Sequence, residues 1–215
     1  MSIIKNIIES SIQAYAAPKP ISVRIGYAWP KAVKKAVKNK SAAVKTLPRP
    51  DVWPFLRDQI GKVLDSAQKT ALKKSTAPWP FSYRLGRMRA RHGAGVLPRF
   101  IELCESSDIV AFDISQYNPN VMFELGLAIA SKGVSSGRVF VFMETLSSDA
   151  IPKSLGEVPS DLAGYFITFY TYGKNGYKFC DPRGFSAALR AIVLDDARNR
   201  GMIVAKGREV EEPTQ

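Results

Sequence analysis

Short apolar runs alternate along this chain with longer segments in which apolar residues recur every three or four positions. Runs of this length predict strands, whereas the three-to-four spacing predicts helices. Strands are expected at residues 22–28, 81–85, 109–113, 138–143 and 165–170. Helices are expected at residues 52–74, 96–105, 121–129 and 185–199. Strands that alternate with helices favour an α/β fold in which a five-stranded parallel sheet is covered by helices on both faces.

The apolar run at 109–112 predicts a central strand that is buried on both faces, as in a parallel sheet. Asp113 follows at its expected carboxyl end, and Asn118-Pro119-Asn120 is a turn that can cap and start a helix. Glu124 then lies near the start of that helix, where the dipole is expected to favour its ionised form. Ligands of open α/β sheets bind in the crevice outside the carboxyl ends of the strands. These polar residues are therefore a candidate site; the alternative is a capped turn with a dipole-paired carboxylate.

The charge of the chain is distributed unevenly. The net charge is +12, and residues 1–100 carry +16 against −4 for residues 101–215. A basic front half beside a mildly acidic α/β half suggests a phosphorylated ligand, a nucleic acid or an acidic protein as partner. A solvated basic surface without a partner is the alternative.

An arginine-rich segment stands out in the basic half. Arg84, Arg87, Arg89 and Arg91 precede a glycine pair, Gly93 and Gly95, and then a predicted helix. Backbone N–H groups at a helix start, with arginines nearby, form a plausible phosphate cradle. The segment lacks the Gly-Lys-Ser/Thr end of a P-loop, and a polar surface loop is the alternative.

The two ends of the chain are expected to lie outside the main domain. Residues 1–20 are expected to form an N-terminal extension of the basic half of the chain, and their isoleucine stripe predicts an amphipathic helix. Residues 21–205 are expected to form the α/β domain, and residues 206–215 a polar tail. The polar face of the first helix is not rich in basic residues, so the helix is expected to pack on protein rather than on a membrane. A homo-oligomer stays open as one way of covering it.

Membrane, metal and redox signals are weak throughout. No apolar run approaches the roughly 20 residues that span a bilayer, so no membrane partner is expected. The two cysteines, Cys104 and Cys180, match no metal-site spacing, so reduced thiols and a cytoplasmic location are expected. No metal and no cofactor is predicted.

The segment Asp113-x-Ser-x-x-Asn118-Pro119-Asn120-Val121-x-x-Glu124-Leu125-Gly126-x-Ala128 resembles the signature of the nucleoside 2-deoxyribosyltransferase-like superfamily. It is also similar to a block in TIR-like bacterial proteins, many of which act in antiphage defence. The resemblance implies a flavodoxin-like strand order. It covers under a tenth of the chain, with a weaker echo at Gly26 and Tyr27, where those families have a glycine-and-aromatic segment over the active site.

The resemblance also implies roles for individual residues. Glu124 corresponds to the catalytic carboxylate, which acts at the anomeric carbon of a ribosyl or deoxyribosyl group. Asn118 lies where the transferases often have an aspartate, which puts transferase chemistry in doubt. Asp113 would hydrogen-bond the sugar or move a proton, and Asn118 and Asn120 would bind ribose hydroxyls. Tyr27 would contact the carboxylate or stack on a base, with ordinary aromatic packing as the alternative.

Two functions from different classes therefore stay open. The first is an enzyme, a hydrolase or deoxyribosyltransferase that cleaves the N-glycosidic bond of a nucleotide, a nucleoside or NAD. NAD is then a substrate and not a cofactor. The second is a non-catalytic module of the same fold that binds a nucleotide or a partner protein.

Overall fold

The computed structural model describes residues 18–27, 50–74, 80–88, 96–115, 117–133, 136–147, 158, 162, 165 and 167–203. The predicted N-terminal helix, the polar tail and two of the expected phosphate ligands, Arg89 and Arg91, lie outside these residues. Tyr27 is described only through its backbone.

The described chain alternates strands and helices as the apolar pattern predicts. In order, the elements are β1 (Ile21–Tyr27), α2 (Trp53–Lys74), β2 (Tyr83–Arg87), α3 (Val96–Glu105), β3 (Ile109–Asp113), α4 (Pro119–Lys132), β4 (Val139–Glu144), β5 (Ile167–Gly173), β6 (Gly176–Phe179) and α6 (Pro182–Asn199). The fold is α/β with one mixed, mostly parallel sheet.

The sheet has six strands in the order β2-β1-β3-β4-β5-β6, and only β6 runs antiparallel to its neighbour. The prediction of five strands, all parallel, is therefore wrong in the count and in the last direction. Residues 173–176 form the tight turn of a β5–β6 hairpin. The strand β6 has four residues, which are too few to show an alternation of apolar and polar positions in the sequence. Gly176, with φ +88°, permits the tight turn before it.

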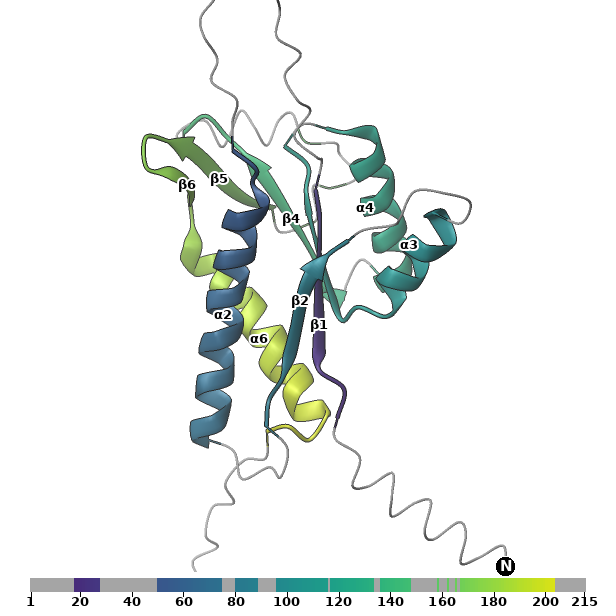
Figure 1. The fold of residues 1–215 in the computed structure, drawn as a ribbon, viewed down its shortest axis with the longest axis vertical. Helices are drawn as coiled ribbons and strands as arrows, with labels where there is room; N and C mark the ends of the chain where they lie inside the picture. The colour runs from purple at the N-terminus through teal and green to yellow at the C-terminus, as the bar shows by residue number, and fades with distance from the viewer. Residues whose placement is uncertain are drawn as a thin grey trace, which may run out of the picture.

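Helices cover both faces of the sheet, as predicted. Figure 1 shows α2 beside α6 on one side and α3 beside α4 on the other. Alternate residues of β3 separate the two cores: Ile109 and Ala111 pack with α2 and α6, whereas Val110 and Phe112 pack with α3 and α4. All five residues of β3 are buried, so this strand is central, as its apolar run predicts.

The parallel strands bring their carboxyl ends to one edge of the sheet. There the chain leaves β1 toward α2 and leaves β3 toward α4, which lie on opposite faces. The strand order β2-β1-β3-β4-β5 has its switch point between these two strands. A crevice for a ligand is expected at this point, and Tyr27 and Asp113 are register partners there.

Candidate functional site

A hydrogen-bond network joins the carboxyl ends of β3, β4 and β5. Asp113 Oδ1 accepts from the backbone N–H of Ser115 at 3.2 Å and from the Ser115 hydroxyl. Asp113 Oδ2 accepts from the Tyr170 hydroxyl at 3.0 Å, and the Ser115 and Tyr170 hydroxyl oxygens are 2.8 Å apart. The backbone N–H of Glu144 donates to Ser115 Oγ at 2.7 Å. Both carboxylate oxygens of Asp113 are therefore engaged within the protein.

Burial dominates the electrostatics of this network. It raises the pKa of the Asp113 carboxyl, while the hydrogen bonds from Ser115 and Tyr170 oppose the rise and the charge of Glu144 adds to it. Burial and then the charge of Asp113 raise the pKa of the Tyr170 hydroxyl far above its ordinary value. Tyr170 therefore stays protonated and acts as a hydrogen-bond donor. These hydrogen bonds explain how the buried carboxylate of Asp113 is stabilised without a ligand. The contact of Asp113 with a sugar stays a prediction.

Glu124 lies outside this network, in the second turn of α4. Val121, Leu125 and Ala128 form the buried stripe of the helix, and Glu124 is half-buried beside it. Burial raises the pKa of the Cys104 thiol on α3, and the charge of Glu124 adds to the rise, so the carboxylate lies on the side of α4 that faces α3. Among the residues that the structure describes, none forms a hydrogen bond or an ion pair with Glu124.

Burial raises the pKa of Glu124. The expected preference for the ionised form at the helix start is therefore wrong in direction. The physical reason is position: the dipole effect falls off within the first turn, and that turn of α4 contains no acidic residue. In the second turn, burial decides the direction of the pKa shift of Glu124.

The two asparagines of the motif form the start of α4. The Asn118 side chain accepts from the backbone N–H of Asn120 at 3.0 Å, and Pro119 occupies the first helical position. This is the capped turn that the sequence analysis gives as the alternative to a site. Asn120 is exposed beside it. A contact of either residue with ribose hydroxyls stays a prediction.

Gly26 has a packing reason to be glycine. It is the register partner of Phe112, and a Cβ on Gly26 would lie 2.5 Å from two carbon atoms of the Phe112 ring. Because the Phe112 ring is fully buried in the core between the sheet and the helices α3 and α4, it has no room to move aside. The glycine of the weaker echo is thus explained by the contact between β1 and β3.

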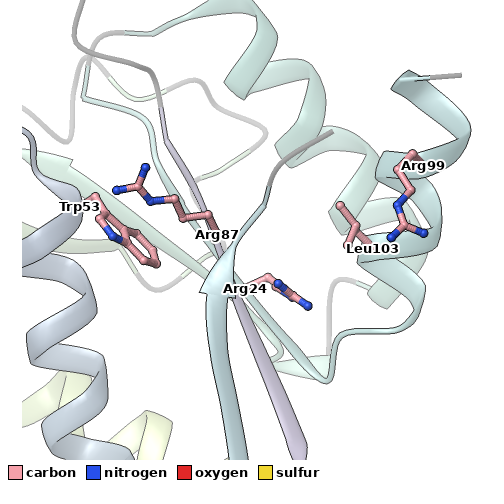
Figure 2. Close-up of a pocket in the computed structure, with 5 residues that line it drawn as sticks. All are labelled: Arg24, Trp53, Arg87, Arg99 and Leu103. Atoms are coloured by element: carbon pink, nitrogen blue, oxygen red, sulfur yellow. The ribbon is translucent and has the colours of Figure 1, made fainter. Parts of the chain in front are cut away.

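The described arginines of the arginine-rich segment lie on the other side of α3 from Glu124. Arg87 stacks on the Trp53 ring at 4.6 Å and lies 3.8 Å from Asp51, and Arg84 is exposed. A hollow of about 640 Å³ opens beside Arg87 (Figure 2) and is lined by Arg24, Trp53, Arg87, Arg99 and Leu103. Arg99 and Leu103 face this hollow, whereas Phe100 and Cys104 of the same helix face the core shared with α4.

The sequence analysis does not single out several residues of these sites, among them Glu144, Tyr170 and Arg24. Glu144 follows an apolar run as Asp113 does, so the same signal identifies it. Tyr170 belongs to a predicted strand, but no local pattern shows that its hydroxyl reaches Asp113, which is 57 residues away. Arg24 lies within the first predicted strand, where a single basic residue is unremarkable.

The sequence matches no protein-family model and no curated protein with which it was compared. The resemblance to the deoxyribosyltransferase-like and TIR-like proteins therefore depends on the motif residues alone. Within the described ranges, no three His, Cys, Asp or Glu side chains come together as ligands for a metal ion. Among the helices that the structure describes, none is both long and apolar enough to cross a membrane.

Proposed function

We propose that this chain cleaves the N-glycosidic bond of a nucleotide, a nucleoside or NAD, with Glu124 as the carboxylate at the anomeric carbon. The observation that carries the proposal is the state of Glu124. It is a half-buried carboxylate with a raised pKa and without a hydrogen-bond donor from the described chain. A charge that is withdrawn from water without compensation is typical of functional sites.

The chemistry requires an anionic group on one face of the sugar. When the bond between the anomeric carbon and the base nitrogen breaks, its electron pair leaves with the base and positive charge develops at the carbon. A carboxylate stabilises that charge or captures the carbon covalently, and water then supplies the hydroxyl group to the sugar and a proton to the base. In a partly desolvated crevice, a fixed carboxylate acts more strongly than it would in water.

The fold supports this placement. α4 begins directly beyond the carboxyl end of the central strand β3, next to the switch point, which is where open α/β sheets bind ligands. The strand order β2-β1-β3-β4-β5 agrees with the flavodoxin-like order that the resemblance implies, with β6 as an addition. We therefore also propose a flavodoxin-like fold and, from the resemblance to TIR-like proteins, a role in antiphage defence.

A non-catalytic module that binds a nucleotide or a partner protein is the second candidate. It is favoured by Asp113 and Asn118, whose side-chain oxygens are engaged in a network and a helix cap. These residues then maintain the crevice and do not react.

The Glu124→Gln variant tests the first candidate. It keeps the size of the side chain and removes the charge, so we expect base release to fall by about 10²-fold or more, as when one preorganised electrostatic group is lost. The measurement is chromatographic detection of free base from NAD, nucleoside monophosphates and deoxynucleosides.

Glu105→Gln is the matched control, because Glu105 is exposed on α3 and undergoes the same chemical change. It should retain full activity. Release of base by Glu124→Gln at the wild-type rate would refute the catalytic role. If the wild type binds a nucleotide but releases no base from any substrate, the module is the better description.

A further inference from the structure

The edge of the sheet at β2 carries a second feature, which is independent of Glu124. The hollow beside Arg87 is followed by another of about 690 Å³, and Arg24 lines both of them. We define the arginine groove by its basic lining residues, which are Lys19, Arg24, Arg84, Arg87, Arg99 and Arg200. It runs along β1 and β2 beside α3.

The groove contains more positive charge than the carboxylates of the described residues neutralise. Arg200 pairs with Asp108, Arg99 with Glu102 and Arg87 with Asp51. The side chains of Lys19, Arg24 and Arg84 have no carboxylate partner anywhere in the part of the chain that the structure describes. Half of the basic side chains of the groove are therefore available to a ligand.

Arg24 is the central member of the groove. It is half-buried, and its guanidinium lies across Gly86 on the neighbouring strand, where a Cβ would approach Nη1 to 2.5 Å. Figure 2 shows it directed from β1 toward α3, away from Arg87 and Trp53. Partial burial of a guanidinium without an anion costs free energy, and an anionic ligand would offset that cost by pairing with it.

The length of the groove indicates an extended ligand. Arg84 is the register partner of Ser22, two residues before Arg24, so Arg84 and Arg24 lie on the same face of the sheet, about 7 Å apart along the strand direction. Arginines spaced in this way can contact successive phosphates of a chain. The guanidinium fork matches phosphate oxygens with two parallel hydrogen bonds. Trp53 is 8% exposed and the rest of the described lining is not aromatic, so the groove offers no platform for stacking bases.

We propose that the arginine groove binds single-stranded nucleic acid through its phosphodiester backbone, without reading the base sequence. A groove between a sheet edge and a helix admits one strand, while a duplex is read by elements that protrude into its own grooves. Binding of this kind is electrostatic and weakens steeply with salt.

The test uses the full chain and fluorescently labelled homopolymers of about 12 nucleotides, as DNA and as RNA. Fluorescence anisotropy is followed from about 50 to 200 mM salt. We expect micromolar-order binding of both strands at low salt, and Arg24→Gln should weaken it several-fold. The slope of log K against log salt should decrease by about 0.7, which corresponds to one lost phosphate contact.

Three variants separate the groove from the overall positive charge. Arg183→Gln removes one charge from an exposed position on α6, on the opposite face of the sheet, and should bind nearly as the wild type does. Arg24→Lys keeps the positive charge, so its salt dependence should be close to that of the wild type and steeper than that of Arg24→Gln. Gly86→Ala should weaken binding at unchanged net charge, because the added Cβ displaces the Arg24 guanidinium.

Several results would overturn the proposal. They are absence of binding by the wild type at low salt, equal losses for Arg24→Gln and Arg183→Gln, and unchanged affinity of Gly86→Ala. Tighter binding of a duplex than of a single strand, or equally tight binding of inorganic tripolyphosphate, would also overturn it. None of these results depends on the activity of Glu124.

Discussion

Glu124 and Asp113 are both withdrawn from water, but only Asp113 receives hydrogen bonds from the described chain. Burial raises the pKa of each. Donors from Ser115 and Tyr170 compensate the charge of Asp113, so this residue maintains structure. The charge of Glu124 has no such donor in the described chain, which is why we propose this carboxylate, and not Asp113, as the reactive one.

The pH dependence of stability should reveal this difference. Because the folded-state pKa of Glu124 is raised, the folded protein binds the proton more tightly than the unfolded chain does. The stabilisation of the folded state by this proton is complete below the unfolded-state pKa of Glu124 and is lost as the pH rises through the folded-state pKa. We therefore expect Glu124→Gln to melt at the same temperature as the wild type, or higher, at about pH 8. The difference should vanish near the ordinary glutamate pKa of about 4.3.

Differential scanning fluorimetry across this pH range measures the effect, with Glu105→Gln as the exposed control. A variant that is clearly less stable than the wild type at alkaline pH would mean that Glu124 is held by stabilising contacts. Glu124 would then not be an uncompensated carboxylate.

At the scale of elements, Tyr170 connects β5 to the end of β3 across the intervening strand β4. Its ring is buried and packs on Phe55 of α2, with ring centroids 5.7 Å apart. One side chain therefore aligns three strand ends and one helix start at the edge where the candidate site lies. The alignment of this edge depends on a contact between elements far apart in the chain.

The Tyr170→Phe variant tests this alignment. It keeps the ring and removes a donor to a buried carboxylate, so we expect a loss of about 1–3 kcal/mol in the free energy of unfolding. Because that hydrogen bond favours the ionised form of Asp113, the loss should shrink as the pH falls through the Asp113 pKa. Urea denaturation at several pH values provides the measurement.

Tyr172→Phe is the control, since Tyr172 lies on the same strand and is 40% exposed. It should change the free energy of unfolding by no more than about 0.5 kcal/mol. Equal effects of the two variants would show that the hydroxyl of Tyr170 contributes nothing particular.

At the scale of the whole molecule, one sheet separates two apolar cores. The core under α2 and α6 is rich in aromatic residues, and Phe185 of α6 contacts three rings of the sheet, those of Phe140, Phe142 and Phe179. Because both cores share the same strands, loss of packing on one face is expected to destabilise the site on the other.

Phe185→Ala should lower the free energy of unfolding by about 3–5 kcal/mol, because it leaves a cavity among rings that cannot collapse. Phe123→Ala is the matched control, since Phe123 is 59% exposed on α4, and it should cost no more than about 0.5 kcal/mol. Urea unfolding monitored by tryptophan fluorescence compares them. A loss below about 1 kcal/mol for Phe185→Ala would contradict the packing argument.

The sequence by itself determined the described elements other than β6, the burial of β3 and the cap of α4. These features depend on neighbours a few residues away: an apolar run marks a strand that is covered on both faces, and Asn118-Pro119 caps and starts a helix. Tertiary structure alone decided that a sixth strand is added beside β5, that Tyr170 reaches Asp113 and that Glu124 lies near Cys104 of α3. It also decided that Arg24 has no partner in the described chain. Those outcomes depend on which strands become neighbours and where helices cross them, and no local period of the chain encodes such distances.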